Sequence, residues 1–545
     1  MSSAPTPASP PSDAPAPPEG QNWIARNLAR VIGPLVRWWV PRRLGGYRNR
    51  VDAQTEGPER LATPRKAAVV GGGLAGLVAA HTLARRGFTV TVFEKNAHLG
   101  GKLGSWDTVT PDGETLPVSH GYHAFFRNYY NLRRFLAEVG GDRHLSPIED
   151  YLILRPDGER MSFGKMDPTP ILNMLALADT GLYRFREVYL TKARSHMGIF
   201  VQYDIDRTHE KYDQTSFAEF AEKTKIPKGL TLAFNNFSRA FFADEDKLSF
   251  AELLKSFHFY YLSNDCGLVY DYPTKDYQAS LLGPIRSALE GLGVTLHTSR
   301  PVERMTRLGD GIEVDGERFD HAVIATDVVG TRAIVERSPG LLVPAMAEKL
   351  SRLRPGQRYA VLRLWIDRDA TEPVPSFTLT DRHRVVDAFA LYHRIEDEAR
   401  AWVERHGGAV LEIHSYALPE DVADGEVRQL LLDEILRYLP SLEGFSIRHE
   451  VMQLERNFTA FHVGMHADRP RVEDGGDRLS FAGDWVRLPF PAMLMECAAA
   501  SGVVAANRAL EAEGLRSEPV WAVPPRGLFS PRPRRTALLA SGSTP

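Results

Sequence analysis

The sequence predicts an α/β fold in which a Rossmann-like domain is interleaved with a second domain of α+β type. Two distant segments support this prediction. Residues 66–94 read as a strand, a glycine-rich turn, a helix and a second strand, and residues 479–502 read as a strand, a Gly-Asp turn and a helix of small residues. We expect the two ends of the chain to close one nucleotide-type site.

The first unit gives each of its glycines a separate task. After the apolar strand at residues 66–70, the first glycine allows a tight turn, the second lets the backbone approach a pyrophosphate, and the third lets the helix pack close to the sheet. The helix N-terminus offers free N–H groups to an anion. The residues expected to hold the phosphates are Gly71, Gly73, Leu74, Ala75 and Gly76.

An acidic residue ends the second strand of this unit. Glu94 lies where a carboxylate can accept both ribose hydroxyls of an adenosine, which argues against a 2′-phosphate. The alternative is a βαβ unit with only a structural role, but strand, glycines, helix and acid in register favour a dinucleotide site. A second glycine pair, Gly100 and Gly101 followed by Lys102, is placed to pass the pyrophosphate again.

Composition limits the class of protein. The chain has 545 residues, a formal net charge of -3 and 43% hydrophobic residues, which favours a large body of two or more lobes without attraction to nucleic acid. Cys266 and Cys497 form neither a zinc spacing nor a disulfide framework, so we expect a reducing compartment and no metal. We also expect no membrane span and no cleaved signal peptide.

The N-terminal region changes character at about residue 21. Residues 1–20 are rich in Pro, Ala and Ser and are expected to be disordered. In residues 21–50, tryptophans and aliphatic residues recur at helical spacing, Arg26, Arg30 and Arg37 lie on another side, and Gly33-Pro34 is expected to kink or divide the helix. This pattern suits a helix in a lipid headgroup layer. The alternative is an amphipathic helix packed on the protein's own surface.

An aromatic segment follows the nucleotide unit. Residues 119–132 combine histidines, tyrosines and phenylalanines with Arg127, which is typical either of a buried helix start or of a pocket wall. Residues 151–278 look helical and strongly aromatic, so they could line a long apolar cavity. Residues 320–326 return the chain to the nucleotide sheet, and strands are expected at residues 359–367 and 410–416.

Three segments resemble the carotenoid aryl-ring synthases, a branch of the FAD-dependent phytoene desaturase and amine oxidase superfamily. They are residues 120–132, residues 257–268 and residues 483–491, within a similarity that spans residues 66–510. The resemblance implies an amine-oxidase-type FAD domain with non-covalent FAD. It places around the cofactor, besides the first glycines, Glu94, Lys95, Gly101, Lys102, Val302, Gly483, Asp484 and Met495.

The same resemblance and the sequence pattern divide the chain into domains. The FAD-binding domain is expected to comprise residues 64–150, 279–335 and 455–515, and the substrate domain residues 151–278 and 336–454. Residues 516–545 are rich in Pro and Arg and are expected to be a disordered tail.

The implied reaction converts a β-ring of a β- or γ-carotene-type substrate into an aromatic ring. The gem-dimethyl carbon of a β-ring cannot join an aromatic ring with both methyls, so desaturation must accompany a 1,2-methyl shift. Trp485 and residues 488–491 are expected beside the reacting ring, and a base must take a proton. The candidate catalytic residues are His120, His123, Tyr130 and Trp485.

Other functions fit parts of the pattern. A linear-carotene desaturase or isomerase of the phytoene or ζ-carotene type is the first alternative, and product analysis would distinguish it. An escort protein of the GDP-dissociation-inhibitor type or a hydrophilic amine oxidase would share the fold, but the complete glycine set, Glu94 and the aromatic lobe disfavour both. For the favoured function we expect a carotenoid substrate, a peripheral position on the cytoplasmic face of the membrane, and a quinone or oxygen as candidate electron acceptor.

Overall fold

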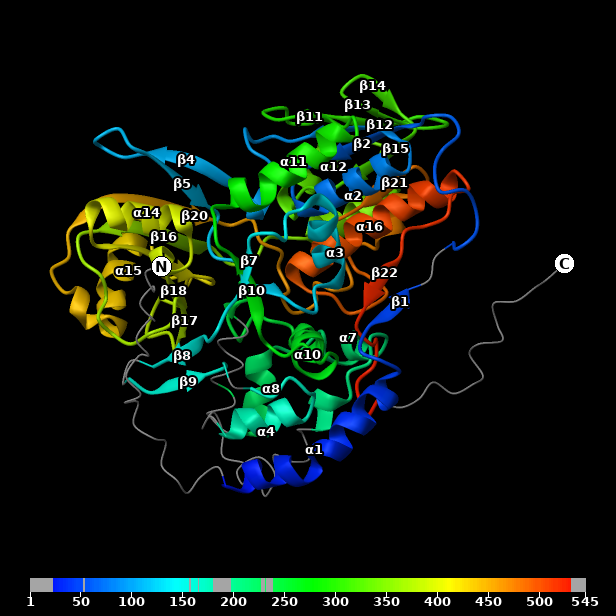
Figure 1. Cartoon of the computed structure of the whole chain (residues 1–545). Helices are drawn as coiled ribbons and strands as arrows, with labels where there is room; N and C mark the ends of the chain where they lie inside the picture. The colour runs from blue at the N-terminus through cyan, green and yellow to red at the C-terminus, as the bar shows by residue number, and fades with distance from the viewer. Residues whose placement is uncertain are drawn as a thin grey trace, which may run out of the picture.

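The computed structural model describes residues 23–51, 54–155, 158–164, 166–179, 198–226, 231 and 239–530 (Figure 1). Three bodies meet at its centre. A nucleotide-type sheet with its helices lies at the top of Figure 1, a larger mixed sheet lies at the left, and a group of helices forms the base. The predicted tail at residues 1–20 lies outside the described residues.

The nucleotide-type sheet is five-stranded and entirely parallel. Its strands come from three distant parts of the chain, as the sequence predicted, and the residues after the first position of its central strand are fully buried. In spatial order they are β11 (Thr295–His297), β3 (Thr89–Phe93), β2 (Lys66–Val70), β15 (His321–Ile324) and β21 (Leu479–Phe481).

Helices α2 (Leu74–Arg85) and α16 (Leu494–Ala512) pack on this sheet and on each other. The contact depends on two glycines. A Cβ on Gly76 would lie 2.0 Å from the carbonyl oxygen of Gly71, and a Cβ on Gly502 would lie 2.4 Å from the carbonyl oxygen of Ala75. Both distances are far below van der Waals contact, so the chain can approach this closely only without a side chain.

The second domain is built on a seven-stranded mixed sheet. Its long strand β16 (Tyr359–Ile366), second from one edge, is buried at every position, because α14 (Asp397–His406), α15 (Asp424–Tyr438) and the rest of the molecule cover both faces. The other strands, in spatial order around it, are β20 (Ile447–Glu455), β19 (Ala409–Ser415), β18 (Ala388–Leu391), β17 (Phe377–Thr380), β8 (Leu152–Leu154) and β9 (Arg160–Ser162).

The predicted helical character of residues 151–278 is correct only in part. The segment begins with β8 and β9, and β8 pairs in parallel with β17, a strand that is distant in sequence. A later strand, β10 (Tyr270–Pro273), joins β6 (Phe125–Phe126) to β7 (Leu145–Pro147). The helices of this segment include α4 (Leu172–Asp179), α7 (Thr208–Tyr212), α8 (Phe217–Thr224), α10 (Phe250–Phe257), a 3₁₀ helix (Gly198–Val201) and a π-helix (His258–Leu262).

The remaining elements connect these bodies. Helix α3 (Tyr130–Val139) packs on α16, and a π-helix (Gln278–Leu282) continues into α11 (Gly283–Gly291). The others are β4 (Ser105–Val109), β5 (Thr115–Ser119), β12 (Met305–Arg307), β13 (Ile312–Val314), β14 (Glu317–Phe319), α12 (Val328–Arg337) and α13 (Pro344–Arg352).

The two ends of the described chain are tied together. Helix α1 (Trp23–Leu44) runs through Pro34 without a break, and β1 (Asn49–Val51) pairs with β22 (Val520–Ala522). Leu528 is fully buried against α1. The prediction of a disordered tail from residue 516 is therefore wrong for residues 516–530, in which Val520, Val523 and Leu528 are buried. Residues 531–545 lie outside the described part.

A buried acid beneath the second sheet should make stability depend on pH. Burial raises the pKa of Glu396 to about 8 from 4.5, against the opposing effect of Arg363. Between pH 4.5 and 8, the folded protein therefore keeps a proton on Glu396 that the unfolded chain releases. The free energy of unfolding consequently falls as pH rises through this range. We predict that Glu396→Gln becomes more stable than wild type above pH 8, with little difference near pH 5, in thermal unfolding followed by circular dichroism.

The matched control is Glu404→Gln, an exposed position on α14, the helix whose N-cap residue is Glu396. It should shift the melting temperature equally at all pH values. A difference in melting temperature between Glu396→Gln and wild type that stays constant from pH 5 to pH 9 would contradict the raised pKa of Glu396.

Candidate functional site

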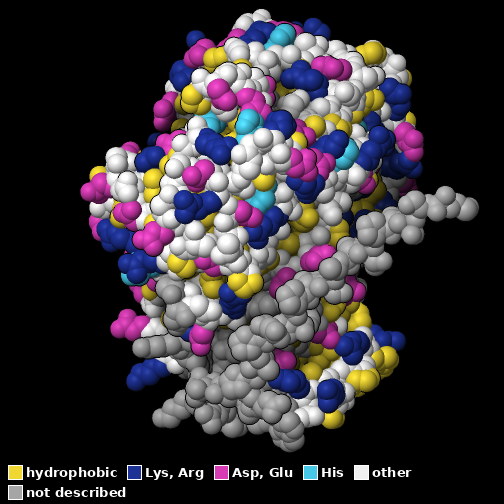
Figure 2. Space-filling view, turned by 60° about the vertical axis from the view of Figure 1, so that its left-hand side comes forward, with side chains coloured by type: hydrophobic (Ala, Val, Ile, Leu, Met, Phe, Trp, Pro, Cys, Tyr) yellow, Lys and Arg dark blue, Asp and Glu magenta, His cyan; other side chains and the backbone are white. Residues whose placement is uncertain are grey.

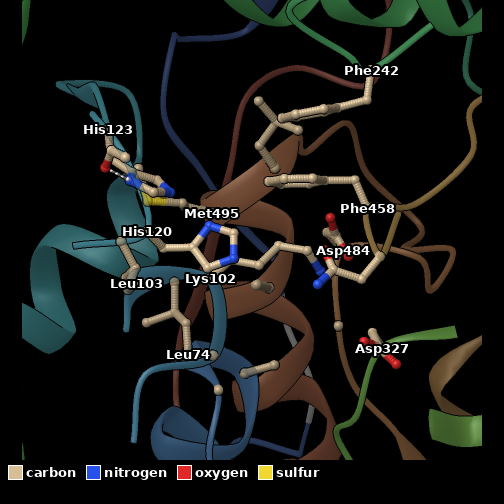
Figure 3. Close-up of a pocket in the computed structure, with 18 of the residues that line it drawn as sticks. Leu74, Lys102, Leu103, His120, His123, Phe242, Asp327, Phe458, Asp484 and Met495 are labelled. Carbon is tan, nitrogen blue, oxygen red and sulfur yellow. Dashed lines mark hydrogen bonds between the residues drawn. The ribbon is translucent and has the colours of Figure 1, made fainter. Parts of the chain in front are cut away.

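One cavity of about 1140 Å³ joins the nucleotide sheet to the aromatic centre of the molecule. It begins at the carboxyl ends of β2, β3 and β15, passes the first turn of α16, and reaches Met174 and Leu177 on α4. Ligands of open α/β sheets bind at this edge, so the fold places the cavity where a nucleotide is expected. Figure 3 shows its central part.

The glycine turn forms one end of the cavity. Gly71 has φ +110°, and a Cβ there would lie 2.6 Å from the carbonyl oxygen of Ala325. Gly73 faces Gly101: a Cβ on Gly73 would lie 3.9 Å from the Gly101 Cα. These two bare backbone segments leave a groove that a pyrophosphate could enter, next to the N-terminus of α2.

Glu94 lies at the same end and is only 5% exposed. Its carboxylate accepts the N–H of Gly72 at 2.7 Å and the N–H of Asn96 at 2.8 Å, which fixes it at the end of β3. Val302 and Arg337 line the cavity nearby. A cradle of bare glycine backbone with an oriented carboxylate fits an adenosine diphosphate moiety.

Of the predicted cofactor-binding residues, all but Gly76 line the cavity. Gly76 faces the backbone of Gly71 instead, which is the packing role expected for the third glycine. The lining residues of this set are Gly71, Gly73, Leu74, Ala75, Glu94, Lys95, Gly101, Lys102, Val302, Gly483, Asp484 and Met495.

The C-terminal motif closes the middle of the cavity. Asp484 accepts a hydrogen bond from the Thr459 hydroxyl at 2.8 Å. The carbonyl oxygens of Asp484 and Trp485 turn away from the cavity, because Arg469 donates to them at 3.2 and 2.9 Å. Arg469 is itself held by Glu252 at 2.9 Å. This buried pair orients the backbone that follows Gly483.

Two histidines and Glu252 lie close enough together to bind a metal ion. They are His209, Glu252 and His466, with ligand atoms within 4.8 Å of one another. Lys255 and Arg469 also contact the Glu252 carboxylate, so its charge is already balanced by two cations. We assign this cluster to positioning the Asp484 backbone through Arg469.

Lys102 projects into the cavity opposite an aromatic pair. Its Nζ lies 4.9 Å from the centre of the Phe458 ring, which stacks on Phe242 at 3.5 Å (Figure 3). Phe242 has φ +57°, a costly conformation for a bulky residue. Among the described residues Lys102 has no ion pair with an acid, so its charge is directed toward the cavity.

His120 and His123 both line the cavity, and Figure 3 shows His120 between Met495 and Lys102. Burial lowers the pKa of His120 to about 4, with Lys102 acting in the same direction, and burial lowers the pKa of His123 to about 4. Both imidazoles are therefore neutral at pH 7. His123 Nδ1 lies 2.8 Å from the Gly121 carbonyl oxygen, which favours the Nδ1–H tautomer.

A buried ion pair holds the histidine segment in place. Arg363 donates to Glu412 at 2.7 Å and to the Ser119 hydroxyl at 2.9 Å, and Glu412 accepts the N–H of Tyr122 at 3.1 Å. Although burial opposes ionisation, Arg363 keeps the pKa of Glu412 at about 2. The segment from Ser119 to Tyr122 is therefore fixed to β16 and β19 of the second sheet.

The positions of Tyr130 and of residues 488–491 do not support their predicted roles. Tyr130 lies on α3 outside the cavity lining. The Arg48 guanidinium lies over its ring, 5.2 Å from the ring centre. Residues 488–491 are also absent from the lining. Trp485 lines the cavity, but its indole is 1% exposed and donates to the Thr326 carbonyl at 2.9 Å, so it forms a fixed wall.

Sequence reasoning missed several lining residues of the second domain. Tyr359, Val361, Phe377 and His414 lie on strands whose residues are almost all buried, and Tyr416 directly follows β19, so sequence alternation gives no sign of which face meets the cavity. Phe458 and Asn457 follow β20 in a loop with no motif. The sequence indicated an aromatic cavity wall only through the aromatic density of residues 151–278.

The fold and the dinucleotide cradle define a flavoprotein of the amine oxidase class. Residues 74–510 match the family described as flavin containing amine oxidoreductase, and the chain belongs to that family. Solved structures share the fold: wild-type putrescine oxidase bound to putrescine has a TM-score of 0.58 and 14% identity, covering 82% of this chain and 99% of that one. A fatty acid isomerase from P. acnes has a TM-score of 0.54 and 16% identity, covering 81% and 97%.

Within this family, the chain is a homologue of carotenoid phi-ring synthases. The protein of that name from Streptomyces griseus is 36% identical over 479 residues, which cover 86% of this chain and 92% of the relative. The one from Chlorobaculum tepidum is 27% identical and covers 92% of this chain and 97% of the relative. The predicted family and FAD cofactor are confirmed, and the protein is an FAD-dependent oxidoreductase.

The glycine contacts give a direct test of the cofactor site. Gly76→Val should force α2 away from the Gly71 carbonyl and widen the phosphate groove, so the purified protein should lose most of its flavin. Because FAD stabilises the form that binds it, added FAD should also raise the melting temperature of the variant less than that of wild type. Flavin absorbance per protein and thermal unfolding measure both effects.

Gly425→Val is the matched control, since a Cβ at Gly425 meets no atom within 4 Å. It should keep full flavin content. Full flavin occupancy in Gly76→Val would refute the assigned groove.

Proposed function

We propose that this oxidoreductase converts the β-ring of a β- or γ-carotene-type substrate into an aromatic ring. The observation that carries the proposal is the continuity of the cavity. It extends past the flavin end into a long wall of aromatic and aliphatic side chains, with Phe126, Tyr129, Phe241, Tyr260, Tyr261 and Leu268 among them. Such a space suits a rigid, apolar polyene.

The chemistry sets what the protein must supply. A β-ring has one ring double bond and an aromatic ring has three, so four hydrogens leave the ring and one methyl moves from the quaternary carbon. Bound FAD supplies the two-electron oxidations, one for each new double bond. The protein must hold the ring against the cofactor, exclude water from a cationic ring, and accept a proton.

The cavity walls meet the first two requirements. Trp485 and the stacked pair of Phe242 and Phe458 bound the central part as fixed surfaces, and their aromatic faces can stabilise a nearby ring cation. Tyr122 stacks on Phe377 at 4.3 Å and extends the aromatic wall toward the second sheet. The neutral imidazoles of His120 and His123, which line the cavity, are the candidate bases.

The alternative is a linear-carotene desaturase. A ζ-carotene desaturase from Synechocystis is 26% identical, but the match covers only 50% of this chain. The phi-ring synthase homologues match 86% and 92% of this chain. We therefore favour ring conversion.

Expression in a β-carotene-producing host should test the reaction. We predict a pigment that has lost four hydrogens for each converted ring, with the absorption spectrum of an aryl carotenoid, and no such pigment with Gly76→Val. Mass spectrometry and absorption of the extracted pigment are the measurements. If wild type instead desaturates only linear precursors in a host that lacks the cyclase, the linear alternative replaces this proposal.

We further propose that α1 docks the enzyme on the cytoplasmic face of a membrane, where carotenoid substrates dissolve. Val36 and Val40 pack on Leu172 and Leu175 of α4, whereas the opposite face exposes Val31, Leu35 and Trp38 by 79%, 64% and 54%. These three are spaced as one helical stripe. Figure 2 shows apolar and basic side chains together at the base of the molecule.

Basic residues border this stripe. Arg30 and Arg42 are exposed, and Arg42 lies over the Trp38 ring at 4.6 Å. Arg26 and Arg37, which we expected to face headgroups, are each paired at 2.6 Å with an acid, Asp179 and Asp167. Their charges are thus neutralised, and docking should depend mainly on the apolar stripe. The described part of the chain contains no helix long and apolar enough to cross a bilayer.

Replacing the stripe should release the protein from lipid. We predict that the triple variant Val31→Ser, Leu35→Ser, Trp38→Ser binds anionic vesicles at least about tenfold more weakly than wild type, because each exposed apolar side chain gains free energy on entering the interface. Wild-type binding should also fall as salt concentration rises. Co-sedimentation with phosphatidylglycerol-containing vesicles measures both.

The control replaces three exposed apolar residues on other faces, Val109, Leu292 and Val343, with serine. This variant should bind vesicles like wild type. Equal vesicle binding by wild type and the α1 variant would show that α1 is not the anchor.

A further inference from the structure

A polar chain leads from the middle of the apolar cavity to solvent. His120 Nε2 lies 3.1 Å from the Tyr359 hydroxyl, and that hydroxyl lies 3.0 Å from Asn457 Oδ1 and 3.5 Å from Glu455 Oε2. His120, Tyr359, Glu455 and Asn457 all line the cavity. Tyr359 is 1% exposed, whereas Glu455 is exposed at the end of β20.

The backbone fixes this arrangement. Tyr359 on β16 and Glu455 on β20 are directly opposite each other in the antiparallel register, so their side chains leave the same face of the sheet. Asn457 Nδ2 also donates to the Glu455 carboxylate and holds it near the hydroxyl. The phenol lies against Phe458 at 4.7 Å and Phe242 at 5.4 Å, which restricts its motion.

Several charged and titratable groups face His120. Lys102 and His98 come from the glycine-rich segment, Glu412 from β19, and Tyr359 and Glu455 from β16 and β20. Burial and Lys102 disfavour a lasting positive charge on the imidazole. A proton that reaches His120 must therefore move on, and the tyrosine hydroxyl is its hydrogen-bonded neighbour.

We propose that His120, Tyr359 and Glu455 form a proton path that carries the proton released by the substrate ring to solvent. The inference rests on the proposed ring conversion. A C–H bond next to the cationic carbon breaks, its electron pair becomes a ring double bond, and the proton passes to His120 Nδ1. The Nε2 proton then moves to the Tyr359 oxygen, and the hydroxyl proton moves to Glu455.

The chemistry of each group suits this sequence. A carbocation is so strong an acid that a weakly basic imidazole suffices to take its proton, and Nδ1 has no hydrogen-bond partner among the described residues. The Tyr359 hydroxyl can rotate from Asn457 to Glu455 because a phenol both donates and accepts. Burial and Glu455 raise the pKa of Tyr359, so the phenol returns to its neutral form after each transfer.

His123 does not offer the same route. Its Nδ1 is bonded to the Gly121 carbonyl, and its backbone N–H donates to the Tyr277 hydroxyl at 3.0 Å. The Tyr277 hydroxyl in turn donates to Gly121, so this network closes on itself in the interior. Of the two histidines, His120 is therefore the one whose hydrogen bonds lead to solvent, through Tyr359 and Glu455.

The test compares the FAD-loaded full-length enzyme with Tyr359→Phe and Glu455→Gln in β-carotene-containing vesicles. Both variants should keep their flavin content and melt near wild type, and both should form product at least about tenfold more slowly. The pH profile of turnover should differ between wild type and Glu455→Gln, because the variant lacks the carboxylate that ends the path. Formate should restore turnover to Glu455→Ala, but not to Tyr359→Phe.

Glu450→Gln is the matched control, because Glu450 lies on the same strand, is paired with Arg428, and does not line the cavity. It should leave rate and pH profile unchanged. Wild-type rates and pH profiles in both Tyr359→Phe and Glu455→Gln would overturn the path. If wild type forms a linear desaturation product instead, the ring proposal fails, but the same comparison still tests the path, because that reaction also releases a proton.

Discussion

The structure depends on a close backbone contact between β2, α2 and α16. Gly76 lets α2 approach the turn after β2, and Gly502 lets α16 approach the backbone of α2 at Ala75. These contacts bring the two ends of the chain to one edge of the parallel sheet, with bare glycine backbone facing the groove. A side chain at either glycine would separate the elements, and the cofactor cradle would lose its shape.

From that edge, the molecule separates two tasks along one cavity. The glycine turn and Glu94 provide the polar end for the nucleotide, and the second sheet with the base helices provides an apolar, aromatic end. The two ends meet at His120, Lys102 and Asp484 (Figure 3). Buried ion pairs, Arg363 with Glu412 and Arg469 with Glu252, lie behind this junction and hold its backbone. The junction is thereby enclosed by fixed walls.

The parts that sequence could predict are those whose function is local. The glycines, Glu94 and Gly483-Asp484 are recognisable from their spacing, and β2, β3, β15 and β21 of the parallel sheet were expected where they occur. The failures involve distant partners: β22 is ordered because β1 pairs with it, and Tyr130 turns toward Arg48 rather than the cavity. The Tyr359–Glu455 pair was not foreseen, because strand register decides which residues of two buried strands meet.

The central claim is that one continuous cavity presents a carotenoid ring to FAD. Anaerobic mixing of the purified, flavin-loaded protein with β-carotene in vesicles tests it directly, because no acceptor is present to reoxidise the cofactor. The account predicts bleaching of the flavin absorbance near 450 nm, roughly in step with loss of ring hydrogens from the pigment. A flavin that stays oxidised with β-carotene, but bleaches with a linear carotene, would contradict it.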